Sequence, residues 1–276
     1  MGIVDFILNL AGLLLWLNWR AEKADPVGKR RPATLIGTLR RADSNSRRWQ
    51  IPAVIAGLIL FRALLYWQIG SAANWWSAKL DLGVTELFFR STYFWQMFFF
   101  SVFSFIETLW IFHLWLLLLS LLNGPPPFNN FVRTQLGALD RLGRRTKILL
   151  PFIATAVLWW VASWLLAWLA VIPNQISALH RLEESLVMGL AAYLAWKVVA
   201  VLLLVLYLLN SYIYFGKQPF WNYVNAEAQT LLSPLKSIPL RAGRADFAPV
   251  VGIVLVLLLA GMAERLLFFL HGRAAM

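Results

Sequence analysis

The sequence predicts an all-α integral membrane protein with about six transmembrane helices. Of its 276 residues, 60% are hydrophobic and only 14% are charged, whereas soluble domains carry about 25% charged residues. The apolar residues are also grouped in blocks of about 20, the length that crosses the hydrocarbon core of a bilayer. A repeated loop motif further organises the last four blocks into two helix hairpins of the same kind, arranged as parallel repeats.

Six segments are apolar enough to span the membrane. The first carries Asp5 and Asn9, so it either spans the bilayer or lies in the interface. It begins without a basic residue, which argues against a cleavable signal peptide. The expected spans are Ile3–Trp19, Ile51–Gly70, Ser91–Leu122, Ile148–Val171, Leu186–Asn210 and Phe247–Leu270.

The basic residues predict the orientation of the chain. The loop Arg20–Gln50 holds nine Lys and Arg residues, and the loops after the third and fifth spans are also basic. The loops on the opposite side hold few. Because basic loops remain in the cytoplasm, we expect these three loops to be cytoplasmic and, if the first segment spans, both termini to lie outside. The bacterial cell inner membrane is the expected location.

The overall charge restricts the expected partners. A net charge of +12 with 15 tryptophans fits either nucleic acid or a membrane surface. No nucleic-acid-binding motif interrupts the helices, so we expect contacts with anionic lipid headgroups and with other membrane proteins, and none with nucleic acid. The chain has no cysteine, which excludes disulfides, thiolate catalysis and cysteine-ligated metals.

Residues 1–90 are predicted to form an N-terminal membrane region. Its basic cytoplasmic segment 24–46 has the prolines and charge of a linker or a partner-binding arm. The stretch Ser71–Arg90 mixes aromatic, aliphatic and charged side chains, which is typical of an amphipathic segment in the outer interface. We therefore expect an outer interfacial helix there.

Two hydrophobic runs end in Leu-Leu-Asn and are followed by nearly the same hexapeptide, Pro-Phe-x-Asn-aromatic-Val. Each hexapeptide lies between two spans, which defines a helix–loop–helix unit in residues 91–175 and again in 176–276. Proline, aromatic and asparagine side chains suit a helix-exit turn and an anchor in the inner interface. The expected loop anchors are Pro127, Phe128, Asn130, Pro219, Phe220, Trp221 and Asn222.

The second unit contains two further motifs. Its loop reads Leu231-Leu232-Ser233-Pro234-Leu235-Lys236 before Pro239, and its last helix opens with Asp246-Phe247-Ala248-Pro249. This unit, over about residues 186–270, resembles the YggT/YlmG family of integral membrane proteins, in which two helices are joined by a loop of this type. The family motif residues here are Ser233, Pro234, Lys236, Asp246 and Pro249, while Ala248 replaces the usual serine. Residues 91–171 resemble a degenerate copy without the Asp-x-x-Pro motif.

The Asp-x-x-Pro motif has a physical role at a helix start. Proline is tolerated in the first turn because its missing N–H has no intrahelical partner there. An aspartate just before that turn caps free N–H groups and favours the positive end of the helix. We therefore expect Asp246 and Pro249 to open the last helix.

Charged residues inside the predicted spans need partners, because charges at membrane depth are costly. Glu107 lies 16 residues before Asn123, and Lys197 lies 13 before Asn210. The difference corresponds to about 5 Å along a helix, so we predict that Glu107 and Lys197 pair across the two units. Arg62 lies at comparable depth and either joins this pair or snorkels outward. These three groups form either a structural ion pair or an ion pathway.

The sequence offers no catalytic constellation. It lacks the metalloprotease, nucleophile-elbow and phosphate-loop motifs, and we expect no enzyme, cofactor or metal site. His113 is the only histidine deep in a span, so a matched pair of haem ligands is missing.

The resemblance to the YggT/YlmG family implies a non-enzymatic protein that organises, or assists assembly of, a membrane complex or the cell envelope. The alternative is an ion or solute transporter or channel that uses Glu107, Lys197 and Arg62.

Overall fold

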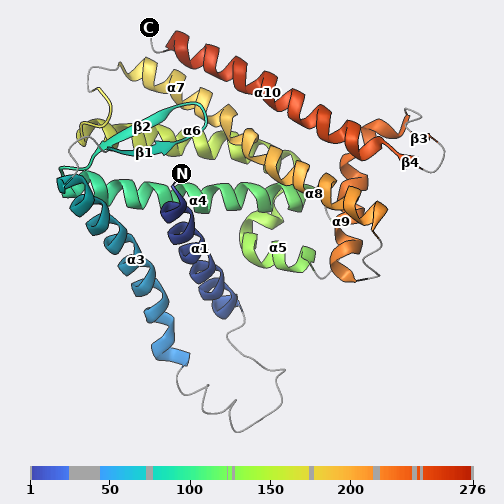
Figure 1. Cartoon of the computed structure of the whole chain (residues 1–276), viewed down its shortest axis with the longest axis horizontal. Coiled ribbons are helices and arrows are strands. Elements are labelled where there is room, and N and C mark those ends of the chain that lie inside the picture. Colours follow the sequence, from blue (N-terminus) through green and yellow to red (C-terminus); the bar gives the residue numbers. More distant parts are fainter. Residues whose placement is uncertain are drawn as a thin grey trace. The chain divides into compact units, whose positions relative to one another are not determined.

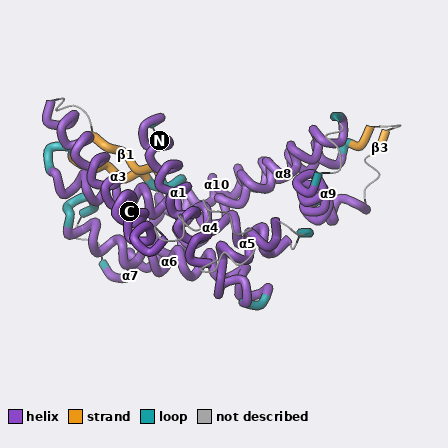
Figure 2. Tube along the Cα trace, turned by 90° about the horizontal axis from the view of Figure 1, so that it is seen from below, coloured by secondary structure: helices purple, strands orange, loops and turns teal. Residues whose placement is uncertain are grey.

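The computed structural model describes residues 2–24, 44–72, 77–122, 124–125, 128–173, 177–213, 218–237, 241–242 and 245–274. These residues are mostly helical, with strands in two short hairpins (Figure 2). Six helical stretches are long and apolar enough to cross a membrane, which confirms the predicted class of a multi-pass all-α membrane protein. They are Ile3–Arg20, Trp49–Gly70, Phe94–Leu122, Arg144–Trp168, Ala178–Tyr212 and Ala248–Gly272.

The chain packs as two compact units, Met1–Trp110 and Ile111–Met276. The boundary falls inside one continuous helix, α4 (Phe94–Leu122). The sequence repeat predicted that the chain divides into regions at residues 90 and 175. The two compact units instead divide within α4, because each part of this helix packs against the neighbours in its own unit.

The first unit contains α1 (Ile3–Ala24), α3 (Ser44–Ala72) and the N-terminal part of α4 (Figure 1). Buried Phe105 of α4 forms a core cluster with two isoleucines of α3, and tryptophans of α1 pack against it. A Cβ on Gly12 of α1 would lie 2.6 Å from the Phe105 ring, so this glycine permits close approach of α1 to α4.

The segment expected to be an outer interfacial helix is instead a β-hairpin. Strand β1 (Ser77–Asp81) pairs antiparallel with β2 (Glu86–Arg90), and alternate side chains of both strands are buried. Gly83 takes φ +82° in the connecting turn, and its N–H donates to Asp81 Oδ1 at 2.9 Å. The prediction of a helix was wrong because the apolar residues alternate with period two, a strand pattern, around this turn.

The second unit contains the remaining helices. Helix α6 packs along α7, and α10 runs beside α7 and α8 (Figure 1). A 3₁₀ turn, η2, joins α7 to α8 within one apolar stretch. The elements are α5 (Phe128–Leu136), η1 (Gly137–Arg141), α6 (Arg144–Trp168), α7 (Ala178–Ala191), η2 (Ala192–Leu194), α8 (Ala195–Tyr212), α9 (Pro219–Leu231), η3 (Ser233–Ser237), β3 (Arg241–Ala242), β4 (Ala245–Asp246) and α10 (Ala248–Ala274).

Two glycines mark close helix packing in this unit. A Cβ on Gly189 of α7 would lie 2.8 Å from the backbone oxygen of Phe152 in α6, as expected for a small-residue contact face. A Cβ on Gly252 of α10 would lie 2.7 Å from Leu232. Gly261 of α10 is not such a position, because nothing lies within 4 Å of its added Cβ.

Candidate functional site

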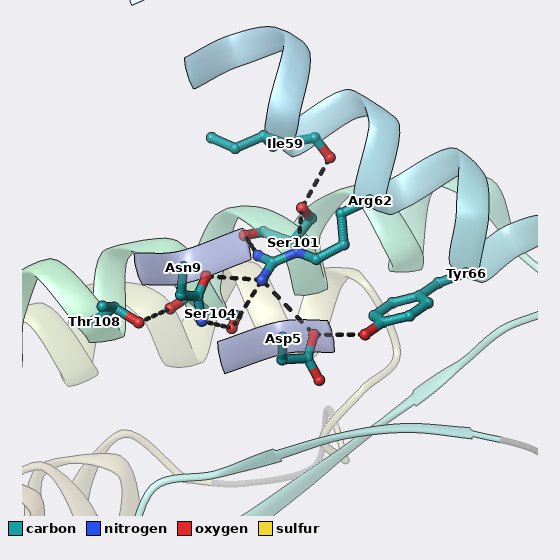
Figure 3. A network of polar contacts seen from close by, with 8 residues as sticks. All are labelled: Asp5, Asn9, Ile59, Arg62, Tyr66, Ser101, Ser104 and Thr108. Atoms are coloured by element: carbon teal, nitrogen blue, oxygen red, sulfur yellow. Dashed lines mark hydrogen bonds and ion pairs between the residues drawn. The ribbon is translucent and has the colours of Figure 1, made fainter. Parts of the chain in front are cut away.

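The most extensive polar network in the described part of the chain surrounds Arg62 of α3 (Figure 3). Arg62 Nε donates to Ser101 Oγ at 2.8 Å, and Nη2 donates to the Ser101 carbonyl oxygen. Nη1 donates to Asn9 Oδ1 at 2.8 Å and to Ser104 Oγ at 3.3 Å, and lies 3.7 Å from Asp5 Oδ1. The guanidinium is therefore held by α1 and α4 and does not snorkel outward.

The partners of Arg62 are themselves fixed by hydrogen bonds. The Tyr66 hydroxyl donates to Asp5 Oδ1 at 2.7 Å, and Asn9 Nδ2 donates to Ser104 Oγ at 2.9 Å. The Ser101 hydroxyl donates to the Ile59 carbonyl at 2.8 Å. A buried cation is tolerated when its charge is paired and its donors are satisfied, so this network can hold three helices in register.

A water-sized cavity lies beside the same network. It is lined by Asn9 and Arg62 together with apolar side chains of α1, α3 and α4. About one water molecule fits in such a space, which is too little for a continuous pathway.

Lys197 of α8 forms an ion pair with Glu264 of α10. The two side chains are 30% and 36% exposed, so this pair lies at the edge of the unit. The sequence singled out Lys197 but did not join it to Glu264, because the depth argument compared α8 with α4 only.

Glu107 belongs to the first unit, and its Oε2 is buried without a hydrogen-bond partner among the described residues. Lys197 belongs to the second unit. The predicted pairing of Glu107 with Lys197 therefore stays a prediction, while the contact present for Lys197 is the one with Glu264.

The two hexapeptides begin short helices, α5 and α9, which meet inside the second unit. The Phe128 ring lies 5.5 Å from the Phe220 ring and 5.4 Å from the Tyr223 ring, centroid to centroid. Pro219 takes the first turn of α9, where its fixed φ suits a helix start. These aromatic anchors, predicted to face the interface, thus also dock the two loops on each other.

The opposite faces of α5 and α9 are accessible. Asn130 and Phe131 of α5 and Asn222 of α9 are exposed, with Phe131 46% accessible. Val132 and Val224 of the same helices are buried. Each loop helix is therefore amphipathic, with one face packed in the unit and one available for contact.

A buried carboxyl group, missed by sequence reasoning, lies next to this aromatic contact. Glu227 of α9 has no accessible surface, and both carboxyl oxygens and the Tyr223 hydroxyl lack ordinary hydrogen bonds to described residues. Burial raises the pKa of Glu227 to about 7, although the neighbouring Gly124 N–H and Tyr223 hydroxyl act to lower it. A Cβ on Gly124 would lie 2.0 Å from Glu227 Oε1.

The repeat contains a signal for this position. Gln135 and Glu227 each lie eight residues after the proline of their hexapeptide. Gln135 is also buried, and its Oε1 lacks a hydrogen-bond partner within the described residues. Extending the hexapeptide by one helical turn would have found both residues, since a buried polar group at matched positions is unusual.

A second charge network lies in the first loop. Lys147 Nζ donates to Asp140 Oδ1 at 2.8 Å and to Ser120 Oγ at 2.6 Å, and Ser120 Oγ donates to Asp140 Oδ1 at 2.8 Å. Burial acts to raise the pKa of Asp140, but the hydrogen bonds from Lys147 and Ser120 outweigh it and lower the pKa. This network ties η1 to α4 and α6.

The structure describes the surroundings of three of the five family motif residues. Ser233 and Pro234 open η3 and are exposed. Pro249 is fully buried in the first turn of α10, as predicted for a helix start. The side chains of Asp246 and Lys236, and Pro127, lie outside the residues whose side chains are described, so the predicted cap stays a prediction.

No group of three or more potential metal-ligating side chains gathers in the described ranges. Comparisons with protein-family models, curated proteins and solved structures found no match for the chain.

Proposed function

We propose that this chain is a non-enzymatic membrane protein that organises, or assists assembly of, a membrane complex or the cell envelope. The observation that carries the proposal is the pair of loop helices, α5 and α9. Their inner faces pack together through Phe128, Phe220 and Tyr223, and their outer faces present the aromatic ring of Phe131 and the amides of Asn130 and Asn222. Exposed aromatic groups beside polar ones are typical of protein interfaces.

The intramembrane charges support a structural role for the spans. Arg62 has hydrogen-bonding and ionic partners on two neighbouring helices, and Lys197 is paired with Glu264. Charges held in this way fix helix register. Under the proposal, the spans hold the loop helices at the membrane surface, and the loop helices contact the partner.

Under the same proposal, the chain is of the YggT type and lies in the bacterial inner membrane. The identity rests on Ser233, Pro234, Lys236, Asp246 and Pro249, and the orientation on the basic loops. Basic residues of these loops, such as Arg133, would also contact anionic headgroups.

Purification from native membranes tests the partner. We would compare the co-purifying membrane proteins of the wild type with those of a Phe131→Ser/Asn222→Ala variant. The lipid-facing substitution Leu258→Ser on α10, where Leu258 is 62% exposed, is the control. We expect one or more stoichiometric partners to be lost only with the loop variant. Partners unchanged by the loop substitutions would contradict the proposal.

The transporter alternative has one observation in its favour, the unpaired buried oxygen of Glu107. Ion and proton flux into liposomes containing the purified chain tests it. We expect flux equal to that of empty liposomes. A flux that Glu107→Gln abolishes, and that the exposed-residue control Leu258→Ser leaves intact, would favour transport.

A further inference from the structure

Arg181 of α7 is a buried cation, and two of its guanidinium nitrogens have no hydrogen-bond partner among the described residues. Only 3% of the residue is exposed, and the two nitrogens are Nε and Nη1. An unpaired buried charge is costly, and removing water from guanidinium N–H groups without replacing their hydrogen bonds adds to the cost.

The nearest acidic side chains along the helix do not supply an anion for this guanidinium. Glu184 interacts with His180, with His180 Nε2 3.5 Å from Glu184 Oε1. Glu183 is exposed. The position of Arg181 makes an anion more favourable still, because it lies in the first turns of α7, where free N–H groups and the helix dipole already contribute positive potential.

The guanidinium is fixed in one orientation by its surroundings. The Arg181 Cζ lies 4.2 Å from the centre of the Trp164 ring of α6, a cation–π stacking distance. A planar guanidinium held against an aromatic ring is preorganised to donate a charge-assisted hydrogen bond to an oxyanion.

The site lies near the surface of the bilayer. The helical stretch Ala178–Tyr212 has 35 residues, which corresponds to about 50 Å at 1.5 Å per residue. The hydrocarbon core is only about 30 Å thick. Arg181 is close to one end of this stretch, and Trp164 is close to the adjoining end of α6, so both lie at the level of headgroups, where tryptophan is enriched.

We propose that Arg181, stacked on Trp164, binds the phosphate group of a membrane-surface anion, of which an anionic phospholipid headgroup is the nearest source. A phosphate oxygen accepts a hydrogen bond from one of the two unused donors, Nε or Nη1, and the negative charge neutralises the guanidinium. This site lies at the end of α6 and α7 remote in sequence from the loop helices, so it is independent of the proposed partner face.

Thermal unfolding of the purified full chain in detergent tests the site. Phosphatidylglycerol, phosphatidylcholine or inorganic phosphate is added, and the rise in Tm is recorded. We expect phosphatidylglycerol to raise Tm more than phosphatidylcholine does. We expect Arg181→Gln to lose at least half of that rise and Arg265→Gln, which removes an exposed arginine of α10, to keep it.

Two further results complete the test. An equal rise from inorganic phosphate identifies a free-phosphate site, whereas a rise with the lipid alone identifies the headgroup. If Arg181→Gln does not fold, Arg181→Lys serves in its place. It keeps the charge but loses the planar guanidinium, and we expect roughly tenfold weaker lipid binding. The proposal is overturned if neither anion raises Tm, or if the Arg181 variants respond as the wild type does.

Discussion

At the scale of single residues, the polar side chains of α1 serve as partners of the buried Arg62 guanidinium. Asp5 and Asn9 make the first span the least apolar in composition, yet both contact the guanidinium. Each polar side chain therefore offsets the cost of burying another. The same logic leaves Glu227, Gln135 and Arg181 as exceptions, because their buried polar atoms lack partners within the described residues.

Replacing Arg62 with methionine should destabilise the first unit. Methionine leaves Asp5 and Asn9 buried without their cation, and breaking a buried pair from one side costs about 3–5 kcal/mol. We expect a lower unfolding midpoint in detergent. Arg265→Met, at an exposed position, is the matched control and should change the midpoint little. Equal midpoints for the two variants would contradict the structural role of the network.

Glu227 should make stability depend on pH. Its folded-state pKa of about 7 lies above its ordinary value of 4.5, so the folded state binds the proton more tightly and stability falls as pH rises through this window. Glu227→Gln carries no charge and should remove this dependence. We expect the variant to be more stable than the wild type at pH 8 by about 1–3 kcal/mol.

The measurement for Glu227 is the unfolding midpoint between pH 4.5 and pH 8. Gln135→Glu, at the matched position of the first hexapeptide, is the companion variant and should introduce a similar dependence. A wild type and a Glu227→Gln variant with the same pH profile would show that the carboxyl group is not buried as described.

At the scale of elements, the long helices follow from composition and the short elements do not. All six spans were predicted, because runs of about 20 apolar residues have few other uses. The hairpin Ser77–Arg90 was missed because its mixture of aromatic and charged residues was interpreted as an amphipathic helix, although the apolar residues alternate with the period of two that is typical of a strand. Helices α5 and α9 were missed because nine and 13 residues are too short to be recognised without the tertiary contacts that stabilise them.

The contact of α6 with α7 should depend on Gly189. A methyl group there would lie 2.8 Å from a backbone oxygen of Phe152, which cannot rotate away. We expect Gly189→Ala to lower stability by about 1–3 kcal/mol, as overpacking does. Gly261→Ala, with open space around its added Cβ, should be neutral. Equal effects of the two substitutions on the unfolding midpoint would contradict the packing described.

Ion pairing between α8 and α10 can be separated from the predicted pairing with α4. Double-mutant cycles would combine Lys197→Met with Glu264→Gln and, separately, with Glu107→Gln. We expect a coupling energy of about 0.5–1 kcal/mol for Lys197 with Glu264, since both are partly exposed, and additive effects with Glu107. Coupling to Glu107 and none to Glu264 would support the pairing of Glu107 with Lys197 that was predicted from depth.

At the scale of the whole molecule, the membrane class was readable from the sequence and the arrangement of charges was not. Hydropathy is a property of each segment by itself, so the spans can be predicted without knowledge of the tertiary structure. Which helix receives Arg62 or Lys197 depends on helix order and rotation, which no single-sequence pattern encodes. The repeat located α5 and α9 in sequence, but their mutual packing through Phe128 and Phe220 emerged only in three dimensions.

Under the proposed function, the outer faces of α5 and α9 form the surface that binds another membrane protein. Site-specific photo-cross-linking in native membranes tests this most directly, with a photoreactive side chain at Phe131 or Asn222 and, as control, at Leu258. We predict a discrete protein adduct from the two loop positions and only lipid adducts from Leu258. Protein adducts absent from both loop positions, or identical at all three positions, would contradict the account.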